Sequence, residues 1–200
     1  MKKTAVIGLG NMGKIIALNL IKNNQVVIVA SRAIDDAISF SLKPEANNLA
    51  VAREIRDAIH EAEIIIPAIW FTGYKDFFAE YGSLLKNKII IDISNPVIPD
   101  GRGGLKRVLE EGKSAGEINA SILPKGAKLA KALGSLTAES FQTKANQNPE
   151  AILFYASDDL EIKNDIEEVI RSSGFRPVYI GGINKTIQME VGGDCHEIHP

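Results

Sequence analysis

The sequence predicts an α/β protein with a doubly wound, mostly parallel sheet of the Rossmann type. Short apolar runs alternate with helical patterns along all 200 residues, which is typical of a sheet covered by helices. The runs are continuously apolar, as expected for parallel strands that are buried on both faces. We expect one domain over residues 1–200, with a core at 1–135 and a small C-terminal α/β continuation at 136–200.

The core opens with a strand–turn–helix–strand unit between Thr4 and Arg32. Its turn follows the pattern G-x-G-x-x-G and reads Gly8-Leu9-Gly10-Asn11-Met12-Gly13. Within a βαβ unit of about 30 residues this pattern predicts a dinucleotide site. The first glycine permits the tight turn, the second lets a pyrophosphate approach the backbone, and the third lets helix and strand pack closely. The alternative is an ordinary strand-to-helix turn that binds no ligand.

The end of the second strand predicts which dinucleotide binds. An NAD site usually has an acidic residue about 20 residues past the glycines, whereas this chain has Ser31 and Arg32 there. A hydroxyl and a guanidinium suit a 2′-phosphate, which a carboxylate would repel. Asp35 and Asp36 follow closely, and we expect them to begin the next helix, where acidic residues are favourable. The sequence therefore predicts NADP(H) as the cofactor.

The remaining elements follow from apolar spacing and from helix-stop residues. Strands are expected at 4–7, 26–30, 49–51, 62–66, 88–93, 127–133, 151–156 and 176–180, because each is a short apolar run bounded by polar or turn residues. Helices are expected at 12–22, 35–42, 53–61, 74–85 and 184–190. Another helix is expected to begin at Ser157 or Asp158 and to stop at Gly174.

Three segments between these elements are less regular. Ser114 is expected to open a helix, because Glu117 follows at the spacing of a capping box. Residues 97–104 are rich in Pro and Gly, and they form either a flap or a long connection. A short helical turn is expected at 105–111, and a loop or a turn of helix at 141–149.

The carboxyl ends of the inner strands are the expected ligand-binding edge. Two segments there are candidate cofactor contacts, Ala68-Ile69-Trp70 and Asn95-Pro96. Trp70 either stacks on a planar ring near the nicotinamide or is a core or interface aromatic. Asn95 either bonds to the ribose or carboxamide or is a turn residue ahead of Pro96.

Composition narrows the functional classes. The net charge is -2, which gives no reason to expect nucleic acid as a partner. We expect no signal peptide, and no stretch of about 18 apolar residues is present to span a membrane. A single cysteine excludes an internal disulfide. These features together predict a cytoplasmic protein.

Candidate acid–base groups are few. Of the three histidines, His60 is expected at the wrong end of the sheet, and His196 and His199 lie in the final residues. No Tyr-x-x-x-Lys pattern follows a strand, so we assign no catalytic residue. This scarcity favours a small-molecule acceptor that takes a hydride without a protein acid, such as a flavin-like ring. Cys195, His196 and His199 have zinc-ligand spacing, but we expect no metal and a tucked or frayed C-terminus.

Several ordered segments together resemble a known family. They are the glycine turn with Ser31-Arg32, Asp92-Ile93-Ser94-Asn95-Pro96, Lys131-Ala132-Leu133, Phe154 to Asp159, Gly174 to Val178, and Met189 to His196. The set resembles the coenzyme F420-dependent NADP oxidoreductases and the related reductase domain of the Steap metalloreductases. The resemblance implies an NADP(H) site at Gly8, Gly10, Gly13, Ser31 and Arg32, and hydride exchange with a deazaflavin or flavin ring, often in a homo-oligomer.

One departure bears on the second substrate. The family usually has Lys-Ala-Phe-Asn-Thr where this chain has Lys131-Ala132-Leu133-Gly134-Ser135, beside the nicotinamide face. We therefore predict an NADP(H)-dependent oxidoreductase, expected as a homodimer, with a deazaflavin or flavin-like acceptor. Two alternatives are a reductase of small carbonyls or imines whose site is completed across a dimer, and a non-catalytic NADP(H)-binding module.

Overall fold

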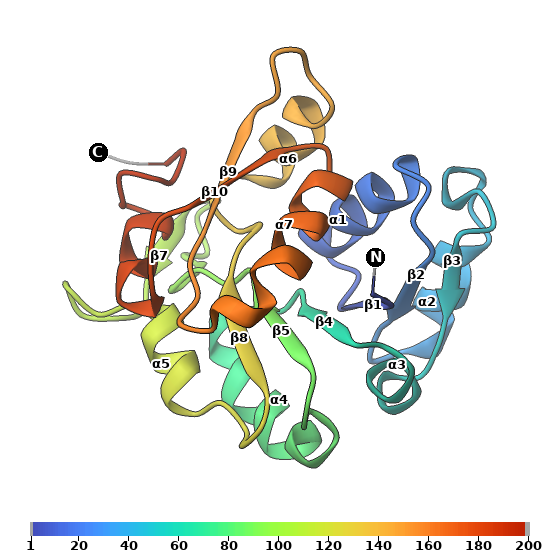
Figure 1. Cartoon of the computed structure of the whole chain (residues 1–200), viewed down its shortest axis with the longest axis horizontal. Helices are drawn as coiled ribbons and strands as arrows, with labels where there is room; N and C mark the ends of the chain where they lie inside the picture. Colours follow the sequence, from blue (N-terminus) through green and yellow to red (C-terminus); the bar gives the residue numbers. More distant parts are fainter. Residues whose placement is uncertain (1, 199–200) are drawn as a thin grey trace.

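The computed structural model describes residues 2–198 and has the predicted fold, with six parallel strands between layers of helices (Figure 1). The strand order is β3-β2-β1-β4-β5-β8, and each neighbouring pair is parallel. The strands are β1 (Thr4–Ile7), β2 (Val27–Ala30), β3 (Ala50–Ala52), β4 (Ile64–Pro67), β5 (Ile89–Asp92) and β8 (Lys128–Lys131). The order changes direction between β1 and β4, and open α/β sheets bind ligands beside such a point.

Helices cover both faces of this sheet. They are α1 (Asn11–Lys22), α2 (Ile34–Ser41), α3 (Ile55–Glu61), α4 (Tyr74–Tyr81), α5 (Ala115–Ser121), α6 (Ala138–Lys144) and α7 (Lys163–Ser172). Ile64 and Ile66 of β4 pack in a cluster with residues of α1 and α7. Ile65 points to the other face, where α3 and α4 contribute to a second cluster. All three isoleucines are fully buried, as the continuously apolar strand pattern predicts.

The C-terminal part packs beside this core. Strands β9 (Ile152–Tyr155) and β10 (Arg176–Tyr179) form a separate parallel pair, which an isolated antiparallel bridge between Lys131 and Ala156 links to β8. A 3-10 helix, η5 (Ile183–Met189), leads into the last described segment, residues 190–198. We call this segment the C-terminal tail.

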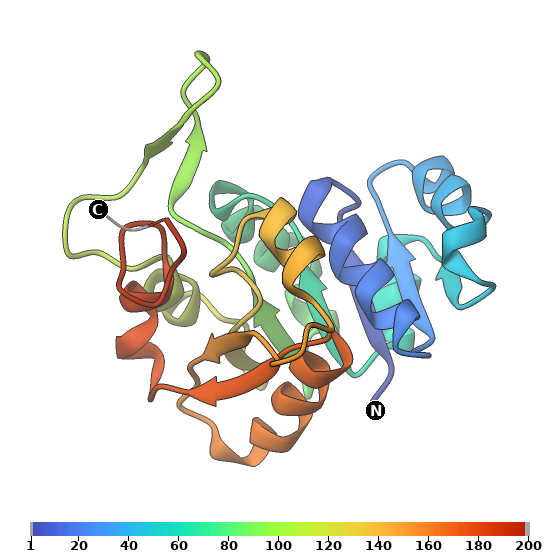
Figure 2. The same ribbon diagram turned by 90° about the horizontal axis from the view of Figure 1, so that it is seen from above.

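The predicted helical turn at 105–111 is wrong. Strand β7 (Leu105–Arg107) pairs antiparallel with β6 (Val97–Pro99), so residues 97–104 form one strand and the connection of a hairpin. The Asp100 carboxylate stabilises that connection by accepting hydrogen bonds from two backbone N–H groups, those of Arg102 and Gly104. The hairpin projects beyond the rest of the chain (Figure 2).

Other differences concern helix ends. Helix α6 begins earlier than the predicted polar segment at 141–149, because the Thr137 side chain caps it by accepting from the N–H of Ser140. The helix expected from Ser157 or Asp158 is capped by Asp159 and opens with a 3-10 turn before α7. The last predicted helix is the 3-10 helix η5. Between residues 2 and 198, no helix combines the length and the apolar character needed to cross a membrane.

Candidate functional site

A cleft of about 470 Å³ lies at the predicted ligand-binding edge of the sheet. Its walls come from residues 10–12 after β1, 68–71 after β4, 93–95 after β5 and 136–137 after β8, together with the β6–β7 hairpin and the C-terminal tail. The cleft therefore begins at the glycine turn and extends over the carboxyl ends of the strands on one side of β1.

The glycine turn has the geometry that phosphate binding requires. Gly8 has a φ of +101°, and a Cβ built on Gly13 would lie 1.9 Å from the carbonyl oxygen of Gly8. Both positions thus exclude a side chain, whereas the space beside Gly10 is open. Helix α1 has no side-chain cap and no acidic residue in its first turn. Its first N–H groups are consequently available to an anion.

Ser31 and Arg32 lie on the other side of this turn. They follow β2, whose last carbonyl, that of Ala30, accepts a hydrogen bond of 2.8 Å from the N–H of Gly8. The Ser31 hydroxyl donates to a carboxylate oxygen of Asp36 at 3.3 Å. Arg32 is exposed, and within residues 2–198 it makes no hydrogen bond or ion pair. Asp36 belongs to the first turn of α2, as expected.

The other predicted contact residues divide into two groups. Ala68, Ile69, Trp70 and Asn95 line the cleft, as do Gly10, Asn11 and Met12, whereas Leu9 and Pro96 are buried outside its lining. Trp70 is 52% exposed, so it is not a core aromatic. The Asn95 amide donates to the Gly134 carbonyl at 2.8 Å and accepts from the Val191 N–H at 2.9 Å. Asn95 thus joins the turn after β8 to the C-terminal tail.

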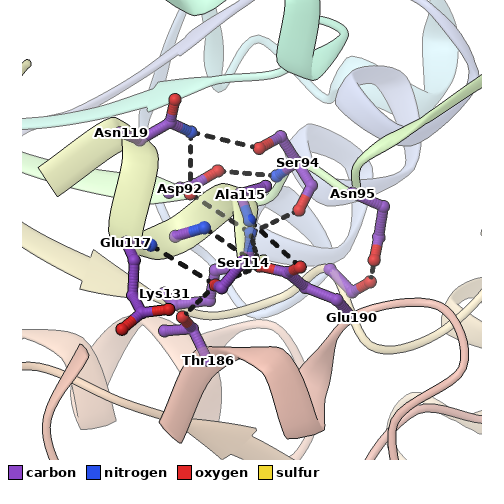
Figure 3. Close-up of polar contacts among 12 residues, drawn as sticks. Asp92, Ser94, Asn95, Ser114, Ala115, Glu117, Asn119, Lys131, Thr186 and Glu190 are labelled. Carbon is purple, nitrogen blue, oxygen red and sulfur yellow. Dashed lines mark hydrogen bonds and ion pairs between the residues drawn. The ribbon is translucent and has the colours of Figure 1, made fainter. Parts of the chain in front are cut away.

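A buried polar network includes Ser94, which lines the cleft, and residues of β5, β8 and α5 (Figure 3). The Lys131 ammonium lies 3.2 Å from a carboxylate oxygen of Asp92 and donates to the Ser94 carbonyl at 2.5 Å. The same Asp92 oxygen accepts from the Asn119 amide at 3.0 Å. Burial would raise the pKa of Asp92, but Lys131 and the hydrogen bonds from Ser94 and Asn119 hold that pKa below its ordinary value. Asp92 is therefore a buried carboxylate anion.

Glu190 connects this network to the C-terminal tail. Its carboxylate accepts hydrogen bonds from the Ser114 hydroxyl at 2.8 Å and from the N–H groups of Ala115 and Gly116 at 3.1 and 2.9 Å. It also lies 3.6 Å from the Lys131 ammonium. The Glu190 carboxylate thus occupies the N-terminal end of α5. Lys131 lies between two carboxylates that are both fully buried.

A second carboxylate fixes the far end of the tail. Glu197 accepts from the N–H of Thr137 and pairs with Lys144 at 3.2 Å. Burial opposes ionisation, but hydrogen bonds from Ser140 and Thr137 and the contact with Lys144 lower the pKa of Glu197 to about 2. Glu190 and Glu197 therefore anchor the tail on both sides of Val191 and His196, which line the cleft together with Ile198.

His196 is one of the cleft residues that the sequence reasoning did not assign to the cofactor site. Its side chain is 4% exposed, it lines the cleft, and its Nδ1 accepts a hydrogen bond from the Ile198 N–H at 2.9 Å. The sequence signals for it were its place in the closing segment Met189 to His196 and its spacing from Cys195 and His199. No group of three or more potential metal ligands occurs within residues 2–198, and His199 lies outside the described residues.

The N-terminal part of the chain is similar in sequence to a known family. Residues 3–96, which include the glycine turn, Ser31-Arg32 and two walls of the cleft, match the sequence profile of the family described as NADP oxidoreductase, coenzyme F420-dependent. The match confirms the resemblance expected from the sequence over those residues. The match covers 94 of the 200 residues, so it relates the N-terminal part of the chain to that family.

One curated protein is similar in sequence to this chain, and two solved structures share its fold. Metalloreductase STEAP3 of Rattus norvegicus is 26% identical over 188 residues, which cover 94% of this chain and 36% of that protein. The chain thus spans about a third of the length of that curated relative. A hypothetical protein from Sinorhizobium meliloti shares the fold with a TM-score of 0.85 and 23% identity, over 98% of this chain and 93% of that one. A candidate F420-dependent NADP reductase from Arthrobacter sp. FB24 also shares the fold, with a TM-score of 0.77 and 21% identity. The match covers 92% of this chain and 87% of that one.

Proposed function

We propose that this chain binds NADP(H) across the glycine turn and transfers hydride between the nicotinamide and a deazaflavin or flavin-like ring in the cleft. One observation carries the proposal. The open start of α1 lies between two different features, the cleft on one side and the exposed Arg32 on the other. A dinucleotide whose pyrophosphate rests on α1 would therefore extend its adenosine end toward Arg32 and its nicotinamide end into the cleft.

The polar groups at the two ends suit the two halves of NADP(H). Arg32 offers a planar guanidinium to a 2′-phosphate, and Ser31 offers a hydroxyl. On the other side, Ala68 to Trp70 and Ser94 to Asn95 border the space into which the nicotinamide would enter. The bound nicotinamide supplies the redox chemistry, and the protein aligns it and excludes water.

The walls of the cleft favour a flat, largely apolar acceptor. Three of the exposed large apolar side chains, Trp70, Leu105 and Ile198, all line this one cleft, with 52%, 51% and 43% of their surfaces exposed. A planar ring can stack on Trp70 and cover the aliphatic side chains. A cytoplasmic location and a homodimer, both expected from the sequence, belong to this proposal, and sedimentation analysis tests the dimer.

Titration calorimetry and turnover test the proposal in two stages. We expect NADPH to bind more tightly than NADH, and its absorbance to fall when a deazaflavin or FMN is added. Trp70→Ala should raise the KM for the ring acceptor and leave the Kd for NADPH unchanged, while Leu160→Ala, which removes an exposed side chain outside the cleft lining, should change neither. Absence of binding refutes the cofactor assignment. Turnover with small imines or carbonyls and with no ring acceptor favours the alternative reductase.

A further inference from the structure

We propose that the backbone N–H of Asn95 donates a hydrogen bond to the ring acceptor in the cleft, and that the buried Lys131 is the positioning residue that orients this N–H. The inference rests on the proposed function and adds to it a contact for the acceptor. The class of acceptor that it requires is a ring with a carbonyl oxygen or a nitrogen that becomes negative when the ring takes up a hydride.

The peptide group between Ser94 and Asn95 has a donor without a partner. Both residues line the cleft. The Asn95 carbonyl accepts the Val97 N–H at 2.8 Å, and the two ends of the Asn95 side-chain amide bind Gly134 and Val191. Within residues 2–198, the Asn95 N–H makes no hydrogen bond. This backbone donor is therefore available to a ligand, and such groups are strong donors.

The contact between Lys131 and Ser94 determines the direction of this N–H. The Lys131 side chain is 2% exposed, and its ammonium donates to the Ser94 carbonyl at 2.5 Å (Figure 3). The bond between Ser94 and Asn95 is trans, and in a planar trans peptide the C=O and the N–H point in opposite directions. Because the carbonyl points to a buried ammonium, the N–H points outward, on the side of the cleft.

Buried contacts hold this peptide group before any ligand binds. The Ser94 N–H donates to Asp92 at 2.7 Å, and Asp92 in turn pairs with Lys131 at 3.2 Å and accepts from Asn119 at 3.0 Å. A donor that is fixed in advance needs no reorganisation when charge develops on its partner. A cation bound to the carbonyl also strengthens the N–H of the same peptide as a donor, because linked hydrogen bonds polarise one another.

The place of Asn95 in the cleft favours the acceptor as its partner. Strand β5 is separated from β1, where the pyrophosphate is expected, by β4. Asn95 lies two residues before the β6–β7 hairpin, and Val97 and Leu105 of that hairpin line the cleft. Leu105 is one of the exposed apolar side chains that we expect the acceptor to cover. A ring between the nicotinamide and the hairpin would meet the Asn95 N–H at its edge.

The charge balance of the step fits a donor that keeps its proton. Transfer of one hydride from NADPH leaves NADP⁺ and places an electron pair, and hence a negative charge, on the ring acceptor. The Asn95 N–H stabilises that charge by a hydrogen bond, and solvent water supplies the proton that later neutralises it.

Backbone NMR tests the contact without turnover. The oxidised ring that the parent protein reduces, FMN or a deazaflavin, is added to the NADP⁺ complex, in which no hydride is available. We expect the Asn95 amide proton to shift downfield and to exchange more slowly with water. The amide of Gly103, an exposed residue outside the cleft lining, should not change. An Asn95 amide that responds to NADP⁺ alone and not to the ring overturns the proposal.

A backbone ester tests the effect on hydride transfer. The α-hydroxy analogue of asparagine at position 95 replaces the N–H by oxygen and keeps the side chain. In single-turnover kinetics we expect the hydride-transfer rate constant to fall about 10-fold, with the Kd for NADPH unchanged. The same exchange at Gly103 should alter neither value. An ester at position 95 that transfers hydride as fast as the parent overturns the proposal.

The role of Lys131 needs a control for stability. At a temperature well below its Tm, Lys131→Met should move the Asn95 amide resonance of the ligand-free protein and lower the same rate constant. Phe141→Ala, which empties a buried position outside the cleft lining, also destabilises the fold but should change neither. A Lys131→Met variant that loses stability alone overturns the positioning role. Failure of the parent protein to reduce any ring acceptor overturns the proposed function itself, which separates that outcome from a failure of this inference.

Discussion

Replacing Lys131 by methionine tests whether the buried network holds the tail. Lys131 is 2% exposed, and its ammonium is shared by Asp92 at 3.2 Å and Glu190 at 3.6 Å, both of which are 0% exposed. Methionine fills a similar volume without the charge. The substitution therefore leaves two carboxylates buried without their cation, and it also removes the hydrogen bond to the Ser94 carbonyl.

The expected loss of stability is large. Removing one partner of a buried ion pair costs about 3–5 kcal/mol. For a chain of this size each kcal/mol lowers Tm by about 2–4 °C, so Tm should fall by roughly 6–20 °C. Part of the loss should be regained by adding Asp92→Asn, because that change removes one of the two uncompensated charges.

The same strand offers a matched control. Lys128 is also paired with two carboxylates, Asp159 at 3.1 Å and Glu161 at 2.7 Å, but its side chain is 34% exposed. Because surface ion pairs contribute about 0–1 kcal/mol, Lys128→Met should lower the free energy of unfolding in urea only slightly. Equal effects of Lys131→Met and Lys128→Met, or a loss below about 1 kcal/mol for the former, would refute the role given to the buried pair.

Three further substitutions test the 2′-phosphate site and the far anchor of the tail. Arg32→Ala should raise the Kd for NADPH about 10- to 150-fold, since a charge-assisted hydrogen bond contributes about 1.5–3 kcal/mol. Calorimetry should show little change in the Kd of this variant for NADH. The Kd for NADPH should also change little in the Arg56→Ala variant, which removes an exposed arginine. Asp36→Asn removes a carboxylate that lies 3.3 Å from the Ser31 hydroxyl and would repel a 2′-phosphate. The Kd for NADPH should therefore fall by up to about fivefold at low salt. The Kd for NADH should not change. Glu197→Gln should cost about 1.5 kcal/mol of unfolding free energy at pH 7. Because folding lowers the pKa of Glu197 from 4.5 to about 2, the difference from the parent should be full above pH 4.5 and disappear as the pH falls toward 2; a difference that persists at the lowest pH contradicts this origin.

Local patterns in the sequence were sufficient for the core of the fold. The apolar runs of β1, β4 and β5 lie at the centre of the sheet, where burial on both faces makes the pattern continuous. The glycine turn was equally clear, because Gly8 and Gly13 occupy positions that admit no side chain.

The errors have a common physical cause. Residues 105–107 of β7 are all exposed, so neither burial nor apolar alternation indicated a strand. Phe141 is the one fully buried residue of α6, which leaves that helix with a weak amphipathic pattern. Where few side chains meet the core, the sequence holds little information about local structure, and cap or turn side chains such as Thr137 and Asp100 determine the outcome.

The site residues that sequence reasoning missed depend on contacts between distant segments. Glu190 meets the start of α5 across 74 positions of the chain, and Lys131 meets Asp92 across 39. A lysine in an apolar strand can be buried only if such a partner is present, so the position of Lys131 was a signal of a buried acid. The identity of that acid required the tertiary structure.

The residues that hold the C-terminal tail in place are different from the residues at the mouth of the cleft. Asp92, Lys131 and Glu190 belong to the segments that carry the resemblance, and all three are buried in the network that holds the tail against α5 and β8. The side chains that reach the mouth of the cleft, such as Trp70 and Leu105, lie outside that network. Changes at the mouth can therefore alter which acceptor fits without loss of the buried ion pairs, whereas changes in the network should displace His196 and weaken the fold together.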